Sequence, residues 1–200
     1  MSVLGRHAAA LADALEGLGT LEGPLAAAAD ALAAALGQGG KVLVAGNGGS
    51  AAEAQHLSGE LVGRLHPARE RPALGAIALH ADTSSLTAVA NDYGYERVFA
   101  RQVEALGRPG DALVVLSTSG ASPNLLAAVQ AGGRLGLATV GLLGPDHRAL
   151  HECCTHVVAV PARSLAAVQE CHLVLVHVLV EMVEDRLGLL LPHSDAAPDG

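Results

Sequence analysis

A histidine and a glutamate four residues apart are the first candidates for chemistry in this sequence. His56 and Glu60 follow an apolar run and a Gly/Asn/Ser cluster in the stretch VLVAGNGGSAAEAQHLSGELVGRL, residues 42–65. On a helix that begins at Ser50 they share one face, so an imidazole and a carboxylate can converge on one metal ion or one substrate carbon. The same spacing is also typical of a solvated helix pair, and this alternative stays open for the two residues alone.

Two turns rich in small polar residues indicate binding of a phosphate or a polyol. The first, AGNGGS, contains Asn47, Gly48 and Gly49, and the second is STSGASPN. Glycine lets the backbone approach an anion, hydroxyl groups add donors, and a helix N-terminus adds free amides with a favourable dipole. The second turn is the better phosphate candidate because of its hydroxyl side chains, which are Ser117, Thr118, Ser119 and Ser122. Either turn alone also fits an ordinary strand-to-helix connection, and neither matches the dinucleotide or Walker A pattern.

Polar residues also interrupt an otherwise apolar run near the C-terminus. Gln169, His172 and His177 lie in LAAVQECHLVLVHVLVEMVEDRL, and a buried helix carries such groups only where each finds a partner. His172 fits either a hydrogen-bonded core residue or a residue that faces an adjoining subunit. Asn91 and Asp92, in VANDYGYE, also fit a common turn sequence.

An alternation of short apolar runs and longer helical patterns must position these residues. We expect strands near 41–45, 74–79, 112–117, 137–143 and 156–160, and helices near 50–64, 84–90, 95–106, 123–134 and 146–151. This alternation predicts an α/β fold with a parallel sheet covered on both faces. A last helix near 164–187 is apolar over most of its circumference, which predicts burial inside the subunit or between subunits.

The remaining segments flank this α/β unit. Residues 1–38 predict a helical hairpin with a break at GTLEGP, where Pro24 suits the first turn of the second helix. Residues 39–188 predict the α/β domain. Residues 189–200 are short, polar and contain proline, which predicts a disordered tail.

Composition argues against several classes of function. The formal charge is −8 and aromatic residues make up 2% of the chain, so nucleic acid finds neither a basic patch nor a stacking surface. No uninterrupted apolar run reaches the ~18 residues of a membrane span. The three cysteines, an odd number with two of them adjacent, suit a reduced cytoplasmic protein. Lys41, the only lysine, starts a strand, which argues against Schiff-base chemistry because ligands bind at the opposite strand ends.

Together, the motifs GNGGSAAEAQH, VANDYGYE, STSGAS and VQECHLVLVH resemble the sugar isomerase (SIS) domain family, and within it the phosphoheptose isomerases. The resemblance runs from Gly39 to Leu187 and more loosely includes the N-terminal helices. It implies a flavodoxin-like five-stranded parallel sheet, a homotetramer with active sites at subunit interfaces, and a Zn²⁺ ion in each subunit. The implied reaction converts sedoheptulose 7-phosphate to D-glycero-D-manno-heptose 7-phosphate through an enediol, as the first step of nucleotide-activated heptose biosynthesis.

The resemblance also implies roles for individual residues. The expected substrate-binding residues are Asn47, Gly48, Gly49, Glu60, Asn91, Asp92, Ser117, Thr118, Ser119, Ser122 and Gln169, with the four hydroxyl residues on the phosphate. The expected metal ligands are His56, Glu60, Gln169 and His177, although such ligands also admit other divalent ions. Glu60 and His177 match the acid/base pair. We expect Glu60 to take the proton and His177 to act as the acid, with the opposite allocation also open.

Gln169 and His177 pose a geometric problem as ligands of one ion. Eight residues of straight helix separate them by ~12 Å along the axis, whereas ligand atoms lie ~2 Å from a zinc ion. We therefore expect them to serve different sites across a subunit interface, unless the helix is irregular or the ion has fewer protein ligands. Ala166 also stands where family members commonly have aspartate, which puts one polar contact in doubt.

A function from a different class stays open at this point. The segment GSAAEA resembles a non-enzymatic relative, a tetrameric protein that binds the bacterial replication initiator. Sequences of that type lack the counterparts of Glu60 and His177, whereas this chain has both. A binding protein has no chemical need for that pair, so the sequence favours the isomerase over the regulator and over other sugar-phosphate isomerases or sensors.

Overall fold

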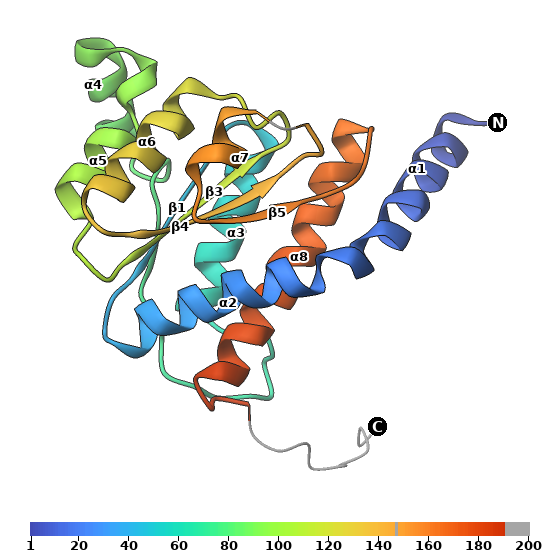
Figure 1. Cartoon of the computed structure of the whole chain (residues 1–200), viewed down its shortest axis with the longest axis horizontal. Coiled ribbons are helices and arrows are strands. Elements are labelled where there is room, and N and C mark those ends of the chain that lie inside the picture. The colour runs from blue at the N-terminus through green and yellow to red at the C-terminus, as the bar shows by residue number, and fades with distance from the viewer. Residues whose placement is uncertain (147, 191–200) are drawn as a thin grey trace.

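A sheet of five parallel strands forms the centre of the structure, a computed structural model that describes residues 1–146 and 148–190. The strand order is β2-β1-β3-β4-β5 (Figure 1). The strands are β1 (Val42–Gly46), β2 (Ala76–Ala78), β3 (Ala112–Ser117), β4 (Ala138–Leu143) and β5 (His156–Ala159). The predicted flavodoxin-like sheet is therefore confirmed. Because the winding direction reverses between β1 and β3, the turns that follow these two strands flank the crevice where such folds bind ligands.

Alternate residues of the central strands enter two separate hydrophobic clusters. In β1, Val42 and Val44 pack into one cluster, built with α2 (Glu22–Gly37), α3 (Gly49–Val62) and α8 (Leu165–Arg186). Leu43 and Ala45 pack into the other, built with α5 (Ala100–Leu106) and α6 (Pro123–Arg134). Every residue of β1 and β3 is buried. This burial explains why both strands read as continuous apolar runs, as expected for parallel strands covered on both faces.

Helices cover both faces of the sheet (Figure 1). One face carries α2 (Glu22–Gly37), α3 (Gly49–Val62) and α8 (Leu165–Arg186). The other face carries α4 (Thr83–Tyr93), α5 (Ala100–Leu106), α6 (Pro123–Arg134) and α7 (Ala149–Cys153). The helix predicted near 95–106 is instead a 3-10 turn, η2 (Tyr95–Arg97), followed by α5. The break falls at Val98 and Phe99, which are fully buried.

Two helices precede the sheet, as the sequence predicts, and Pro24 lies in the first turn of the second. The first is α1 (Val3–Gly17), and the 3-10 turn η1 (Leu18–Leu21) joins it to α2. Figure 1 shows α2 crossing α8, while α1 extends outward beyond the sheet. Ala14 is the buried residue of α1, and its first apolar residues, Val3 and Leu4, are exposed. The predicted tail lies outside the described residues from position 191 onward.

The helix α8 corrects the expectation that no segment is long and apolar enough to cross a membrane. The helix has 22 residues, and an 18-residue window of it with a mean hydropathy of 1.5 meets that test by length and composition, but half of this window is buried inside the domain. The buried face packs in the core through Val168, Leu175, Val176, Leu179, Val180 and Val183. The burial identifies α8 as the core helix of a globular domain, as its polar residues also require.

An ion pair between Lys41 and Asp111 joins the amino ends of β1 and β3. Lys41 Nζ donates to Asp111 Oδ2 at 2.6 Å, and the main-chain amides of Lys41 and Arg108 donate to the same carboxylate at 2.9 and 2.8 Å. Burial acts to raise the pKa of Asp111, but the hydrogen bonds and the lysine charge outweigh it and hold the pKa below its usual value. The ionised carboxylate therefore stabilises the folded state.

We expect Asp111→Asn to lower the free energy of unfolding by about 1–3 kcal/mol at pH 7, because a neutral amide cannot neutralise the ammonium. A carboxyl group with a lowered folded-state pKa contributes fully above its unfolded pKa of about 3.9 and loses that contribution as the pH falls through the folded value. Urea unfolding should therefore show a difference from wild type that is full at pH 7 and shrinks below pH ~4. Glu104→Gln, which removes an exposed partner of Arg97, serves as the control. A difference that stays constant with pH would contradict the assignment.

Candidate active site

Side chains from α3 and α8 form a cluster that can hold a metal ion. His56 and Glu60 lie one turn apart on α3 and face His177 on α8. Nε2 of His56 is 2.8 Å from Nε2 of His177 and 3.5 Å from Oε1 of Glu60. The ligand atoms of the three residues all lie within 4.8 Å of one another. The pair on α3 is therefore part of a convergent cluster rather than an isolated solvated pair.

The donor atoms of this cluster fit Zn²⁺. Two imidazole nitrogens and one carboxylate oxygen form a ligand set used by catalytic zinc sites, which leaves a fourth position for water or substrate. Nitrogens that bind one tetrahedral zinc ion at ~2.0–2.1 Å lie about 3.3 Å apart, so the two rings need to separate by about 0.5 Å. The side chains of His56 and Glu60 are 37% and 20% exposed, so a small molecule can approach them.

Gln169 does not join the other three expected ligands. Because α8 is helical without interruption from Leu165 to Arg186, Gln169 and His177 are separated by ~12 Å along its axis. The side chain of Gln169 lies instead against Gly49, where an added Cβ would come within 2.6 Å of the amide Nε2. The irregular-helix alternative is therefore wrong for the single chain. Gly49 thus leaves room for the side chain of Gln169 beside the turn after β1, and a larger residue there would displace that side chain.

The turns that follow β1 and β3 are joined by a reciprocal amide pair. Nδ2 of Asn47 donates to Oδ1 of Asn124 at 2.9 Å, and Nδ2 of Asn124 donates back to Oδ1 of Asn47 at 2.9 Å. The hydroxyl of Tyr95 donates to Oδ1 of Asn47 at 3.3 Å. These side chains line a cleft of about 210 Å³ together with Ser122. Sequence reasoning missed Asn124, although its place in the first helical turn after a hydroxyl-rich loop was a usable signal.

The hydroxyl-rich loop at 117–122 is held in a tight conformation. Ser117 is buried, and its Oγ accepts a hydrogen bond from the amide of Gly120 at 3.1 Å. Ser119 is exposed, and its Oγ accepts from the amide of Ala121 at 3.4 Å. Gly144, at the end of β4, touches this loop so closely that an added Cβ would lie 2.0 Å from the carbonyl oxygen of Thr118. Gly144 is thus a loop-shaping residue that sequence reasoning missed.

Asn91 and Asp92 occupy the last turn of α4, a helix without buried residues. Both side chains are exposed, and Nδ2 of Asn91 donates to Oδ1 of Asp92 at 2.8 Å. Gly94 follows with a φ of +83°, which ends the helix. The expected polar residues are therefore presented to solvent at a helix end rather than in a free turn.

A second histidine of α8, His172, lies in the core between α3 and the end of β4. His172 is fully buried, with Nε2 3.3 Å from the carbonyl oxygen of Leu143 and Nδ1 3.7 Å from Oε2 of Glu53. Among the described residues, neither Nδ1 of His172 nor Oε2 of Glu53 has a hydrogen-bond partner. His172 is thus a core residue of the single chain. Sequence reasoning missed Glu53, one turn before His56, because no local pattern indicates that it faces α8.

Comparison with known proteins identifies the family. Residues 6–144 match the SIS domain family. The phosphoheptose isomerase of Burkholderia pseudomallei strain K96243 is 51% identical over 159 residues, which cover 80% of each chain. That of Chlorobaculum parvum is 52% identical over 165 residues, which cover 82% of this chain and 79% of the relative. The structure of a phosphoheptose isomerase from Francisella tularensis superposes with a TM-score of 0.85 at 37% identity, covering 92% of this chain and 100% of the other. This chain therefore belongs to the phosphoheptose isomerases of the SIS domain family.

Proposed function

We propose that the chain converts sedoheptulose 7-phosphate to D-glycero-D-manno-heptose 7-phosphate at the cluster of His56, Glu60 and His177. The observation that carries this proposal is the convergence of two imidazoles and a carboxylate, at 2.8 and 3.5 Å, on a partly exposed face. Isomerisation of a ketose to an aldose needs such a set, namely a base near C1 and C2 and a proton donor at the carbonyl oxygen. Relatives about half identical in sequence carry the name of this activity.

Glu60 is the base in the proposed mechanism. Its carboxylate takes the proton from C1 while the carbonyl oxygen at C2 gains a proton, which gives the enediol. Glu60 then returns its proton to C2, and the hydroxyl on C1 gives its proton to His177, which leaves the aldehyde and regenerates the acid that protonated the oxygen at C2. Oε1 of Glu60 faces His56 at 3.5 Å, so Oε2 is the oxygen free to move the proton.

His177 is proposed both as a ligand and as the acid at the carbonyl oxygen. A single ring nitrogen cannot bind a metal and donate a proton at once, so Nε2 of His177 serves only one of these roles in a given step. With His56, Glu60 and His177 as ligands, Zn²⁺ would polarise the carbonyl group and stabilise the enediolate as a Lewis acid. Another divalent ion with the same preference for nitrogen and oxygen ligands would supply the same chemistry.

The proposed assembly is a homotetramer with active sites between subunits. Glu60 lies eleven residues after Gly49. It is therefore ~16 Å along the axis of α3 from the turn after β1, residues 47–49, of its own chain. Beside His177, Leu173, Val174 and Val178 of α8 are 40%, 39% and 37% exposed. A second subunit packed on this apolar stripe would also reach the cluster. The same arrangement would bring the hydroxyl-rich loop of one chain (residues 117–122, the phosphate turn) to the metal ligands of another chain.

The cytoplasm is the proposed location. The substrate is a phosphorylated metabolite, and all three cysteines, Cys153, Cys154 and Cys171, are free. Burial raises the pKa of the Cys154 thiol to about 12, so this group stays protonated and unreactive at neutral pH. These features suit a reducing compartment.

The direct test is conversion of the proposed substrate by the full chain. Purified protein is incubated with sedoheptulose 7-phosphate, with Zn²⁺ or after removal of metal by a chelator, and the aldose phosphate is detected by NMR. We expect the aldose with metal and a loss of turnover of at least about 100-fold after metal removal, restored by added Zn²⁺. If the metal-loaded protein forms no aldose, the isomerase proposal fails and the replication-initiator binding protein becomes the better hypothesis. Unchanged turnover of verified metal-free protein would overturn the metal assignment alone.

A further inference from the structure

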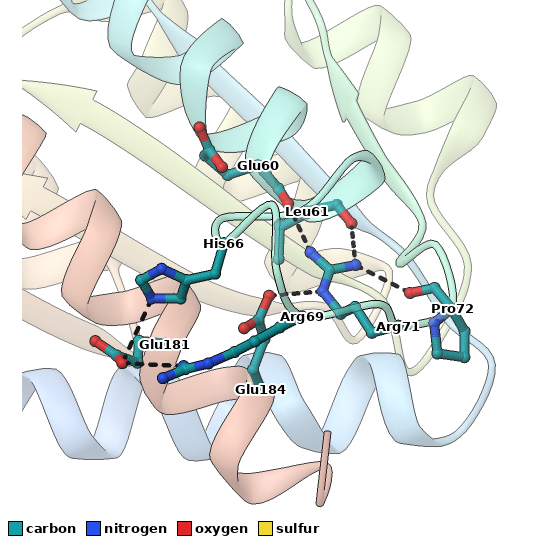
Figure 2. Close-up of polar contacts among 8 residues, drawn as sticks. All are labelled: Glu60, Leu61, His66, Arg69, Arg71, Pro72, Glu181 and Glu184. Atoms are coloured by element: carbon teal, nitrogen blue, oxygen red, sulfur yellow. Dashed lines mark hydrogen bonds and ion pairs between the residues drawn. The ribbon is translucent and has the colours of Figure 1, made fainter. Parts of the chain in front are cut away.

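A buried arginine holds the end of α3 that carries Glu60. Arg71 lies in the loop after α3 and is 8% exposed. Its Nη2 donates to the carbonyl oxygen of Glu60 at 2.6 Å, and its Nη1 donates to that of Leu61 at 3.0 Å (Figure 2). Since α3 ends at Val62, these carbonyls belong to its last turn, where no later helical amide is available to them. The guanidinium of Arg71 therefore acts as a side-chain cap for the catalytic end of α3.

The same guanidinium also binds α8. Nε of Arg71 donates to Oε1 of Glu184 at 2.6 Å, and Glu184 is 3% exposed (Figure 2). Glu184 follows His177 by seven residues, which is two turns of the same helix and hence nearly the same face. One buried side chain thus connects the turn of α3 that carries Glu60 to the helix that carries His177.

Energetics indicate that this ion pair sets geometry more than stability. Two charges buried together gain little over well-packed apolar residues of similar volume, because both lose their hydration. Their hydrogen bonds are nevertheless directional, and three of those from Arg71 fix the last turn of α3 relative to α8. A displacement of about 1 Å at a catalytic group is enough to reduce turnover about 100-fold.

A second contact between the loop and α8 is longer than the contacts of Arg71. Arg69 and His66 approach Glu181 of α8 at 3.5 and 3.7 Å, and Glu181 is 48% exposed (Figure 2). These contacts are longer than hydrogen bonds, and they join the loop to α8 without touching α3. Among the residues drawn in Figure 2, Arg71 is the one that joins α3, the loop and α8.

We propose that Arg71 and Glu184 are positioning residues that set the distance between Glu60 and His177, and thereby the metal affinity and turnover of the cluster. This inference rests on the proposed function of the cluster. Neither residue touches the substrate in this scheme; both act through the backbone of α3.

The test compares full-length variants in three measurements: Zn²⁺ affinity by competition with a chromophoric chelator, kcat and KM with sedoheptulose 7-phosphate, and urea unfolding. Arg71→Met combined with Glu184→Met replaces the ion pair by apolar side chains. We expect this double variant to fold, to lose at least about 10-fold in Zn²⁺ affinity and about 10–100-fold in kcat, with KM changed less than about threefold.

Two further variants separate positioning from stability. Arg71→Lys keeps a positive charge opposite Glu184, but the lysine ammonium cannot reach both carbonyl groups of α3. We therefore expect this variant to lose Zn²⁺ affinity and kcat, which keeps the test decisive even if the double variant does not fold. Arg186→Met is the matched control. Arg186 ties α8 to Asp30 and to the carbonyl of Ala26 on α2, a helix without cluster residues. The Arg186→Met variant should unfold at a different urea concentration from wild type, while its kcat and Zn²⁺ affinity stay within about twofold of the wild-type values.

The outcomes are distinguishable from failure of the proposed function. If wild type and variants bind Zn²⁺ with the same affinity and the Arg71 variants keep wild-type kcat, the positioning inference is overturned. Equal losses in Arg186→Met and in the Arg71 variants would also overturn it, because they would show a general effect of stability. If wild type lacks isomerase activity, the proposed function fails, while the Zn²⁺ affinities still decide the positioning role.

Discussion

Glu60→Gln is expected to reduce kcat by about 10²–10⁴-fold, since the amide keeps the size of the carboxylate but cannot take a proton. The free energy of unfolding should change little, because the side chain of Glu60 is partly exposed and makes no short hydrogen bond with any residue that the structure describes. Conversion is followed by NMR in D₂O, where wild type should also exchange the C1 proton of the substrate for deuterium. The variant should lose this exchange together with turnover.

The control for this variant is Glu70→Gln. Glu70 is 84% exposed and pairs with Arg64 in the loop after α3, so it carries the same chemical change outside the cluster. We expect its kcat to equal that of wild type. Wild-type turnover and exchange in Glu60→Gln would show that the base lies elsewhere, with His177 as the first candidate.

Mixing two inactive variants is expected to restore up to about a quarter of wild-type activity, if sites are shared between subunits. Glu60→Gln leaves the phosphate turn intact, whereas Ser119→Glu leaves the cluster intact and puts a negative charge where phosphate would bind. When each site takes one part from each of two chains, random assembly of equal amounts gives one site in four with both parts intact. The expected recovery is therefore large against the background of either variant alone.

The measurement uses two differently tagged chains that are expressed together and purified through both tags. Co-expression of each variant with itself is the control and should stay inactive. A mixed assembly without recovered turnover would place the whole site within one chain. In that case one chain would have to present the cluster and its own binding turns to the same substrate, although Glu60 lies ~16 Å along α3 from the turn at Gly49.

Local patterns were enough to predict the sheet and most helices. The strands near 112–117 and 137–143 were found because parallel strands buried on both faces need continuous apolar runs. Helix starts were also encoded locally: Asp82 and Ser164 accept hydrogen bonds from amides in the first turns of α4 and α8, and Pro123 stands at the first position of α6. The edge strand β2 is shorter than its predicted range, 74–79, because pairing with β1 extends only from Ala76 to Ala78.

Contacts between distant elements could not be predicted in the same way. Nothing in the sequence places Asn124 against Asn47, or Glu53 against His172, since each pair depends on how whole helices pack. Arg71 lies in a loop without periodicity, so its four hydrogen bonds to Glu184 and to three carbonyl groups had no sequence signal. The resemblance to the family predicts the ligand set, but it does not say which of these residues meet within one chain.

The spacing of His56 and Glu60 is enough to place both on one face, because it equals about one helical turn. The spacing of Gln169 and His177 likewise excludes that both reach one ion from a straight helix. That His177 rather than Gln169 meets the pair on α3 depends on how the two helices pack. The reason is physical: periodicity fixes which residues share a face, whereas the rotation and the level of α8 against α3 are set by core packing and by buried contacts such as Arg71 with Glu184.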